Sequence, residues 1–118
     1  MNKPGEIRVI VLGLIQDGDR LFVSEGYDPV KQQTFYRALG GGVDFGETSH
    51  AALQREFHEE IQAKLTNIRY LGCLENLFIY NGQPGHEIIQ LYQCDFADPK
   101  FYQQERLVFL DGGEKNTA

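Results

Sequence analysis

Apolar residues dominate the chain from residue 7 to residue 15, where Val, Ile and Leu follow one another almost without interruption. Such a run is typical of a strand that is buried on both faces. Asp17-Gly18, within residues 16–19, then marks a tight turn. Residues 20–24 are predicted to return as a partner strand, so the pattern predicts a β-hairpin at the start of the chain.

Polar residues and glycines separate this hairpin from a helix. A loop is predicted over residues 26–33 and a short third strand over residues 34–38, which ends at the glycine run 40–42. Glu47-Thr48-Ser49 then opens a helix, because a Thr or Ser hydroxyl can accept a hydrogen bond from the free N–H groups. Apolar side chains at helical spacing form one face for packing against a sheet. They are Ala51, Ala52, Leu53, Phe57 and Ile61.

The second half of the chain reads as strands. Residues 68–80 alternate and are rich in β-branched and aromatic side chains, Asn81-Gly82 marks a turn that residues 83–85 extend, and residues 88–96 return. Asp98-Pro99 breaks the returning strand, and residues 107–110 are predicted to form one more. The polar tail, residues 111–118, is expected to be mobile. The element order predicts an α/β (α+β) fold.

Length and charge narrow the function classes. A chain of 118 residues with 42% hydrophobic residues suits a single domain, residues 1–118. The formal net charge of −6 disfavours partners such as nucleic acid and anionic membrane surfaces. A small anionic substrate remains compatible if metal ions or local arginines neutralise it.

Cys73 and Cys94 each lie in an apolar, strand-like stretch. We interpret them as two reduced, buried thiols rather than as a disulfide. The apolar run at residues 7–15 is too short for a membrane span and lacks the pattern of a cleaved signal peptide. A cytoplasmic protein is therefore expected.

Three carboxylates share one face of the predicted helix. Glu56, Glu59 and Glu60 are spaced i, i+3 and i+4, so their like charges repel. One interpretation is a solvated acidic face on which Arg55 pairs with Glu59. The other is a site for a hard cation such as Mg²⁺, which prefers oxygen ligands, with Glu47 as a fourth carboxylate. The glycine run and the helix start would then form a corner that binds a diphosphate.

The spacing Gly41-x5-Glu47-x7-Arg55-Glu56-Phe57-x-Glu59-Glu60 resembles the signature of the Nudix hydrolase family. The order of the flanking strands also resembles that family's α/β/α sandwich with a mixed β-sheet. The family's signature closes with Gly and an aliphatic residue, where this chain has Gln62 and Ala63, so the helix end is open to question. The family often has Pro at the position of Gly40.

Family members usually continue into another strand and a closing helix after a stretch like residues 114–118. The resemblance therefore implies a C-terminally truncated domain, or a fold that a partner completes. Large apolar side chains left uncovered are usually covered by association. We expect a homodimer or larger assembly, or a monomer of marginal stability.

By the resemblance, the protein is a metal-dependent diphosphatase (pyrophosphohydrolase) that uses Mg²⁺ or Mn²⁺. Water would attack phosphorus in a diphosphate linkage of a nucleoside diphosphate joined to another moiety. Glu56 and Glu60 would be metal ligands, Glu59 a ligand or the base, and Arg55 would orient a glutamate and the loop. Glu47 and the Gly41 carbonyl would complete the metal site.

Residues outside the signature remain open between two roles. Glu87, which follows His86 after the 82–85 turn, is either the general base of the reaction or an exposed turn residue. Arg37, just before the glycine run, is either a phosphate contact or a partner in a surface salt bridge. Gly41 and Gly42 would let the backbone approach the substrate.

Aromatic residues near the presumed cleft can stack on a base or fill the core. They are Phe35, Tyr36, Phe45, Phe78 and Tyr80. His50 and His58 are expected to face solvent. Two other function classes are a non-catalytic Nudix-like module that binds nucleotide and regulates another activity, and a purely structural domain. The complete set of signature carboxylates disfavours the first, and their spacing disfavours the second.

Overall fold

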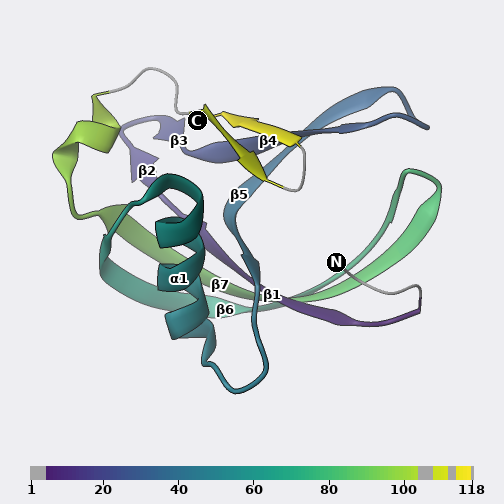
Figure 1. The fold of residues 1–118 in the computed structure, drawn as a ribbon, viewed down its shortest axis with the longest axis horizontal. Coiled ribbons are helices and arrows are strands. Elements are labelled where there is room, and N and C mark those ends of the chain that lie inside the picture. The colour runs from purple at the N-terminus through teal and green to yellow at the C-terminus, as the bar shows by residue number, and fades with distance from the viewer. Residues whose placement is uncertain (1–4, 104–107, 112–113, 118) are drawn as a thin grey trace.

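The computed structural model describes residues 5–103, 108–111 and 114–117. Its main element is a five-stranded sheet with the strand order β4-β5-β1-β7-β6 (Figure 1). Strands β1 and β7 run parallel and the other neighbours are antiparallel, so the sheet is mixed. Its strands are β1 Arg8–Leu14, β4 Val23–Asp28, β5 Gln33–Gly42, β6 Leu65–Tyr80 and β7 Gln83–Phe96.

The apolar run near the N-terminus forms the central strand β1, as predicted, but its partners differ from the prediction. Strand β1 lies between β5 and β7. The predicted turn closes a separate small hairpin of β2, Gln16–Asp17, and β3, Arg20–Leu21. A strand that is apolar on both faces needs neighbours on both edges to be buried. The adjacent short segment does not supply them.

The predicted loop at residues 26–33 is wrong, because the chain stays extended on both sides of a shorter connection. Strand β4 continues to Asp28 and β5 begins at Gln33. The buried Asp28 carboxylate accepts hydrogen bonds from the Val30 and Lys31 N–H groups, which closes the turn. Strand β5 also continues through the glycine run, where a Cβ at Gly40 would collide with the Val11 carbonyl oxygen.

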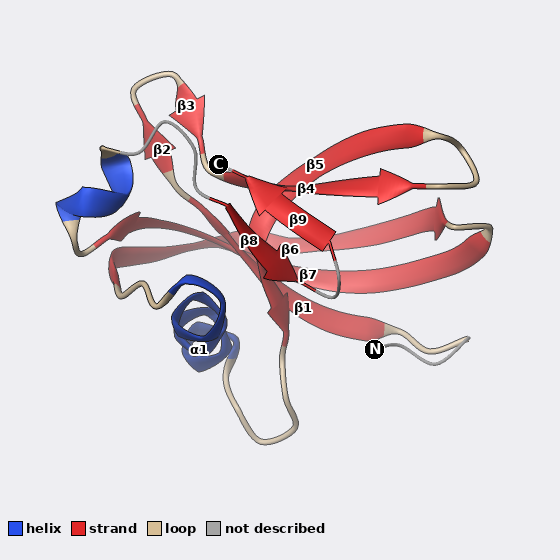
Figure 2. Ribbon diagram, turned by 45° about the horizontal axis from the view of Figure 1, so that its top comes forward, coloured by secondary structure: helices blue, strands red, loops and turns tan. Residues whose placement is uncertain are grey.

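Helix α1, Ser49–Ile61, covers one face of the sheet (Figure 2). Thr48 is the N-cap, and its hydroxyl accepts a hydrogen bond from the Ala51 N–H group at 3.1 Å. The predicted apolar stripe is buried except for Ala51, which is exposed. Gln62 ends the helix in the left-handed conformation, with φ 53°, and its N–H group donates to the His58 carbonyl.

Strands β6 and β7 are longer than predicted and meet at a two-residue turn. Asn81 and Gly82 have φ angles of 52° and 76°, so the turn joins Tyr80 directly to Gln83. Residues 83–85 therefore belong to β7 rather than to the turn. Both hairpins, β4–β5 and β6–β7, extend away from the centre of the sheet (Figure 1).

After β7, the chain turns through a short 3₁₀ helix, η1 (Pro99–Tyr102), at the predicted break. The last elements are β8, Val108–Asp111, and β9, Glu114–Thr117, which pair as a hairpin near β4 (Figure 2). Asp111 and residues 114–117 of the polar tail, which was expected to be mobile, lie in strands β8 and β9. Residues 107, 112, 113 and 118 of the predicted strand and tail lie outside the described residues.

The two faces of the sheet carry separate apolar clusters. Val11 and Tyr92 pack with the helix on what we call the α1 face, whereas Ile10, Leu12 and Ile89 form a cluster on the opposite face. The architecture is the predicted α+β fold with a mixed sheet. The described residues contain one α-helix, so they do not form the second helical layer of a sandwich.

Both cysteines are free, as predicted, but only Cys94 is buried and Cys73 is exposed. Cys73 lies on β6, an outer strand of the sheet, which leaves its side chain open to solvent. Within the described part of the chain, no helix is long and apolar enough to cross a membrane.

Candidate active site

Arg55 is the centre of the carboxylate cluster. Its side chain leaves α1 and reaches the loop that precedes the helix. Its Nη2 atom lies 2.6 Å from Glu47 Oε1 and donates to the Gly42 carbonyl at 2.9 Å. Its Nη1 atom lies 3.0 Å from Glu56 and 3.3 Å from Glu59. One guanidinium thus links the glycine strand, the loop and the acidic face of the helix.

Glu47 fastens the loop to the helix. Its Oε1 atom also accepts a hydrogen bond from the Asp44 N–H group at 2.9 Å, while Oε2 accepts one from Arg55 Nε at 3.0 Å. The Arg55 hydrogen bonds, followed by that from Asp44, lower the pKa of Glu47 from 4.5 to about 2. The same pairing raises the pKa of Arg55 above its ordinary value. Both groups are therefore charged at neutral pH.

Glu56 lies against the backbone of β5. A Cβ at Gly41 would collide with the Glu56 carboxyl group, so a larger residue there would displace the carboxylate from this position. On the other side of the strand, a Cβ at Gly42 would lie 3.1 Å from Arg8 Nη2. The glycine run therefore has charged side chains packed closely against its backbone.

The carboxylates suit a hard divalent cation in their chemistry but are not arranged as a finished cage. All the side-chain donors are oxygens, which Mg²⁺ prefers, and Mg²⁺ usually takes only one or two carboxylates besides water and substrate. Among the residues that the structure describes, no three His, Cys, Asp or Glu side chains form a metal-binding group. Glu47, a predicted ligand, has both oxygens on Arg55. Arg55 also contacts Glu56 at 3.0 Å and Glu59 at 3.3 Å, so an ion would share these carboxylates with it.

Glu87 is not the exposed turn residue of one sequence interpretation. It lies inside β7 and is only 3% exposed. Arg37 Nη2 lies 3.7 Å from its Oε1 atom. Because alternate strand residues share a face, Glu87 lies on the face of Ile89, opposite α1. The structure therefore does not bring Glu87 together with the signature carboxylates, and His86 points to the other face of β7.

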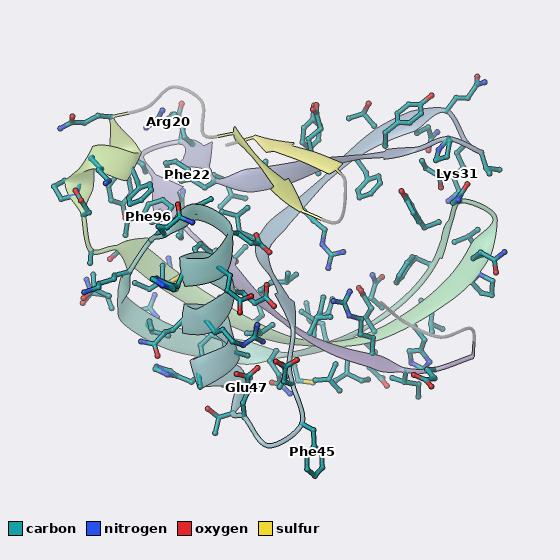
Figure 3. The ribbon with its side chains drawn as sticks, in the orientation of Figure 1. Arg20, Phe22, Lys31, Phe45, Glu47 and Phe96 are labelled. Carbon is teal, nitrogen blue, oxygen red and sulfur yellow. The ribbon has the colours of Figure 1, made fainter. Side chains whose placement is uncertain are left out.

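The predicted aromatic residues separate into two groups. The rings of Phe35 and Tyr80 are 5.8 Å apart, and Phe78 packs over Gly85. Tyr36 is exposed and bonds to Glu25, so it does not share their environment. Phe45 is fully exposed at the tip of the loop beyond Glu47 and points away from the molecule (Figure 3).

His50 and His58 are both exposed, as predicted, and the centroid of the His50 ring lies 6.0 Å from that of Tyr92. Two charged residues near the site were missed from the sequence. Asp44 lies 3.5 Å from Arg55, and Arg8 lies against Gly42. Asp44 lies between Gly41 and Glu47 of the signature, so its place in the sequence could have indicated that it is close to the site. The position of Arg8 beside Gly42 depends on how β1 and β5 are aligned, and this alignment cannot be read from the sequence.

Comparisons with known proteins agree with this arrangement. A family model described as the NUDIX domain matches residues 6–110. The structure is similar to a MutT NUDIX hydrolase from Burkholderia pseudomallei, with 23% identity and a TM-score of 0.63 over 79% of this chain and 70% of that one. It is also similar to a NUDIX hydrolase from Nitrosomonas europaea, with 21% identity and a TM-score of 0.66 over 98% of this chain and 71% of that one.

A UDP-X diphosphatase matches with 14% identity and a TM-score of 0.59 over 97% of this chain and 50% of that one. At these identities the solved structures support the fold alone. The family match extends over most of the chain and includes the glycine strand, the loop and the carboxylate-bearing helix. The chain therefore belongs to the NUDIX family of hydrolases, which act on diphosphate bonds.

Proposed function

We propose that the protein is a Mg²⁺- or Mn²⁺-dependent pyrophosphohydrolase that cleaves the diphosphate linkage of a nucleoside diphosphate joined to a second group. The observation that supports this proposal is the cluster around Arg55, which gathers the carboxylates of the loop and helix beside the glycine strand. The similarity in fold to a UDP-X diphosphatase supports the substrate class.

Charge explains why a cation is needed at this face. A diphosphate is anionic, and so are Glu56, Glu59 and Glu60, so direct contact between them is repulsive. A bound divalent ion neutralises phosphate oxygens and lowers the pKa of water. In our proposal, Glu56 and Glu60 hold the ion, and Glu59 either adds a ligand or accepts a proton. Arg55 keeps Glu56 and the loop in place.

The reaction is a substitution at phosphorus. Water forms a new P–O bond, the bond to the bridging oxygen breaks, and the leaving phosphate retains the electron pair. Glu59 is the better candidate to accept the proton of water, because its side chain is exposed beside Arg55. Glu87 lies on the opposite face of the sheet and is assigned no proton transfer.

The test is hydrolysis of a panel of nucleotide sugars, dinucleoside polyphosphates and nucleoside triphosphates, with Mg²⁺ and with chelator. We expect turnover of a nucleoside diphosphate-linked substrate that stops on chelation and returns with metal. Glu60→Gln should lower kcat about 10²-fold or more, because it removes a charge that stabilises the transition state. The matched change Glu75→Gln, on the exposed side of β6, should leave kcat unchanged.

Two results would contradict the proposal. Turnover that continues in chelator would exclude the metal assignment. Nucleotide binding by the wild-type protein without turnover of any substrate in the panel would instead indicate a non-catalytic module.

A further inference from the structure

Glu87 stands out as a buried carboxylate that the proposed chemistry does not use. Burying a charge is unfavourable unless a partner compensates it. Its charge partner is Arg37. The distance from Arg37 Nη2 to Glu87 Oε1 is 3.7 Å, which exceeds the length of a good hydrogen bond. Within the described residues, no hydrogen bond to the Glu87 carboxylate accompanies this ion pair. Arg37 is therefore the group that compensates the buried charge of Glu87.

The pair joins two hairpins that also touch at their tips. The Asn81 N–H group donates to Asp28 at 3.2 Å, and Lys31 Nζ donates to the Ile79 carbonyl at 3.0 Å. We call this arrangement of β4–β5 and β6–β7 the hairpin arch. Figure 1 shows the two hairpins leaving the centre of the sheet and approaching again at their ends. Arg37 and Glu87 connect its two sides nearer the glycine run.

Arg37 differs from Glu87 in exposure. Its side chain is 39% exposed, against 4% for that of Glu87. A guanidinium has five N–H donors in a planar fork and can contact a carboxylate with one edge and an anion with another. Glu87 lies beside one side of the guanidinium, and the Arg37 side chain as a whole remains partly exposed to solvent.

A second arginine adds to the positive charge on this face. Arg8 is the direct strand partner of Glu87, and its guanidinium lies against Gly42. Two arginines, Arg8 and Arg37, therefore neighbour the single carboxylate of Glu87, whereas Arg55 is surrounded by several carboxylates. In a protein with a net charge of −6, this locally positive position is suited to an anionic group.

We propose that Glu87 is a positioning residue that orients Arg37, and that Arg37, on the strand that leads into the glycine run, binds an anionic group of the nucleotide substrate. This inference rests on the proposed function. Glu87 restricts the guanidinium to one orientation, so less side-chain freedom is lost when the substrate binds. Arg37 contributes to substrate affinity and Glu87 acts through it.

The assignment is tested first by binding without catalysis. UDP, which lacks the second group of the proposed substrate, is titrated into the whole chain by calorimetry in the presence of Mg²⁺. Arg37→Met should weaken binding about 10-fold or more, as expected for a lost charge-assisted contact. Glu87→Gln should weaken it about 3- to 10-fold. Arg20→Met is the matched control, because Arg20 lies far from the hairpin tips where Lys31 is found (Figure 3), and it should bind like wild type.

A double variant separates positioning from a merely structural role. If Glu87 acts through Arg37, Glu87→Gln should have no further effect on binding in the Arg37→Met background. For hydrolysis, both single variants should raise KM and leave kcat and its pH profile nearly unchanged. Arg37→Lys, which keeps the charge without the fork, should have an intermediate KM.

Three outcomes would overturn the inference. Additive effects in the double variant would make Glu87 independent of Arg37. A lower melting temperature for Glu87→Gln with unchanged binding would make the ion pair structural. A loss of kcat together with loss of the acidic limb of the pH profile would make Glu87 the general base. Absence of turnover in every variant, with UDP binding still dependent on Arg37, would refute the proposed function and leave the binding site intact.

Discussion

Arg55 has the most partners among the charged residues of the site. Four carboxylates surround it, those of Asp44, Glu47, Glu56 and Glu59, and the Gly42 carbonyl accepts a further hydrogen bond. Its loss would leave several like charges facing one another without compensation. This arrangement explains how a short helix tolerates an acidic face that repels itself.

The first prediction concerns acid stability. The pKa of Glu47 is lowered to about 2 in the folded protein, from 4.5, by its hydrogen bonds from Arg55 and from the Asp44 N–H group. Its stabilising contribution is therefore complete above about pH 4.5 and is lost as the pH falls toward 2. In chelator, wild type should have a higher melting temperature than Glu47→Gln at pH 6, and the difference should narrow steadily as the pH falls from 4.5 toward 2.

The Arg55→Met background is the control for this experiment. There the Glu47→Gln change should produce no pH-dependent difference in melting temperature. A difference that does not narrow between pH 4.5 and about pH 2.5, or that survives in the Arg55→Met background, would show that Glu47 stabilises the fold by another contact.

The second prediction concerns the two thiols. Burial, followed by the nearby Asp95 charge, raises the pKa of Cys94 to about 12, whereas Cys73 is exposed. Because the thiolate is the reactive form, a thiol reagent should modify one cysteine in the native protein and both after denaturation. Cys73→Ser should abolish the native reaction, and Cys94→Ser should not. Native modification of both thiols would contradict the burial of Cys94.

At the residue level, the sequence predicted those contacts that depend on spacing within the helix. Arg55 and Glu59 are one helical turn apart, so their pairing follows from local geometry. The contact of Glu56 with Gly41 and the burial of Glu87 beside Arg37 depend on strands that are distant in sequence. No local pattern contains that information.

Among the elements, helix α1 was predicted well because capping and apolar periodicity act locally. The strands were predicted to be too short. Gly26, Asp28 and the glycine run are poor strand formers, yet pairing with neighbouring strands holds them extended. The predicted partner of β1 was wrong for a similar reason. The short connection after β1 indicated a hairpin with the next segment, but a strand that is buried on both faces pairs at the centre of the sheet, between β5 and β7.

The third prediction tests the end of the helix. Gln62 occupies the left-handed region with φ 53°, which is unfavourable for a residue with a side chain. Gln62→Gly should raise the free energy of unfolding by roughly 0.5–1 kcal/mol. Urea unfolding at a constant m-value measures this difference.

Gln54 provides a matched control within the same helix. It is exposed in the middle of α1, so Gln54→Gly should lower the free energy of unfolding by about 1 kcal/mol. The same chemical change should thus have opposite signs at two positions. If both variants are destabilised, the helix does not end at Gln62 in solution.

For the whole molecule, the outer edge of the sheet predicts self-association. Strand β6 is sixteen residues long, and none of the strands in the described ranges pairs with its outer edge. Leu74, Leu77 and Ile79 are exposed along it, with Leu77 at 74%. Long edge strands with apolar side chains favour pairing with another chain, so we expect a second copy to cover this strand.

The fourth prediction follows from that edge. Sedimentation at several protein concentrations should show a dimer that dissociates on dilution, with a melting temperature that rises with concentration. Leu77→Lys should weaken association at least about 10-fold, because a charge would be buried between the copies. Leu21→Lys, at an exposed position on β3, should not. A monomer at all concentrations would show that β6 is stable as a free edge.

The parallel pairing of β1 with β7 has a consequence for the order of events during synthesis. Arg8 pairs with Glu87 and Leu14 with Gln93, so β1 leaves the ribosome long before its parallel partner exists. Hairpins β4–β5 and β6–β7 join near neighbours and can close early, whereas closing the β1–β7 contact requires most of the chain. Until then, the apolar β1 has only β5 as a neighbour. This interval is the stage at which a nascent chain is most exposed to aggregation and most dependent on chaperones.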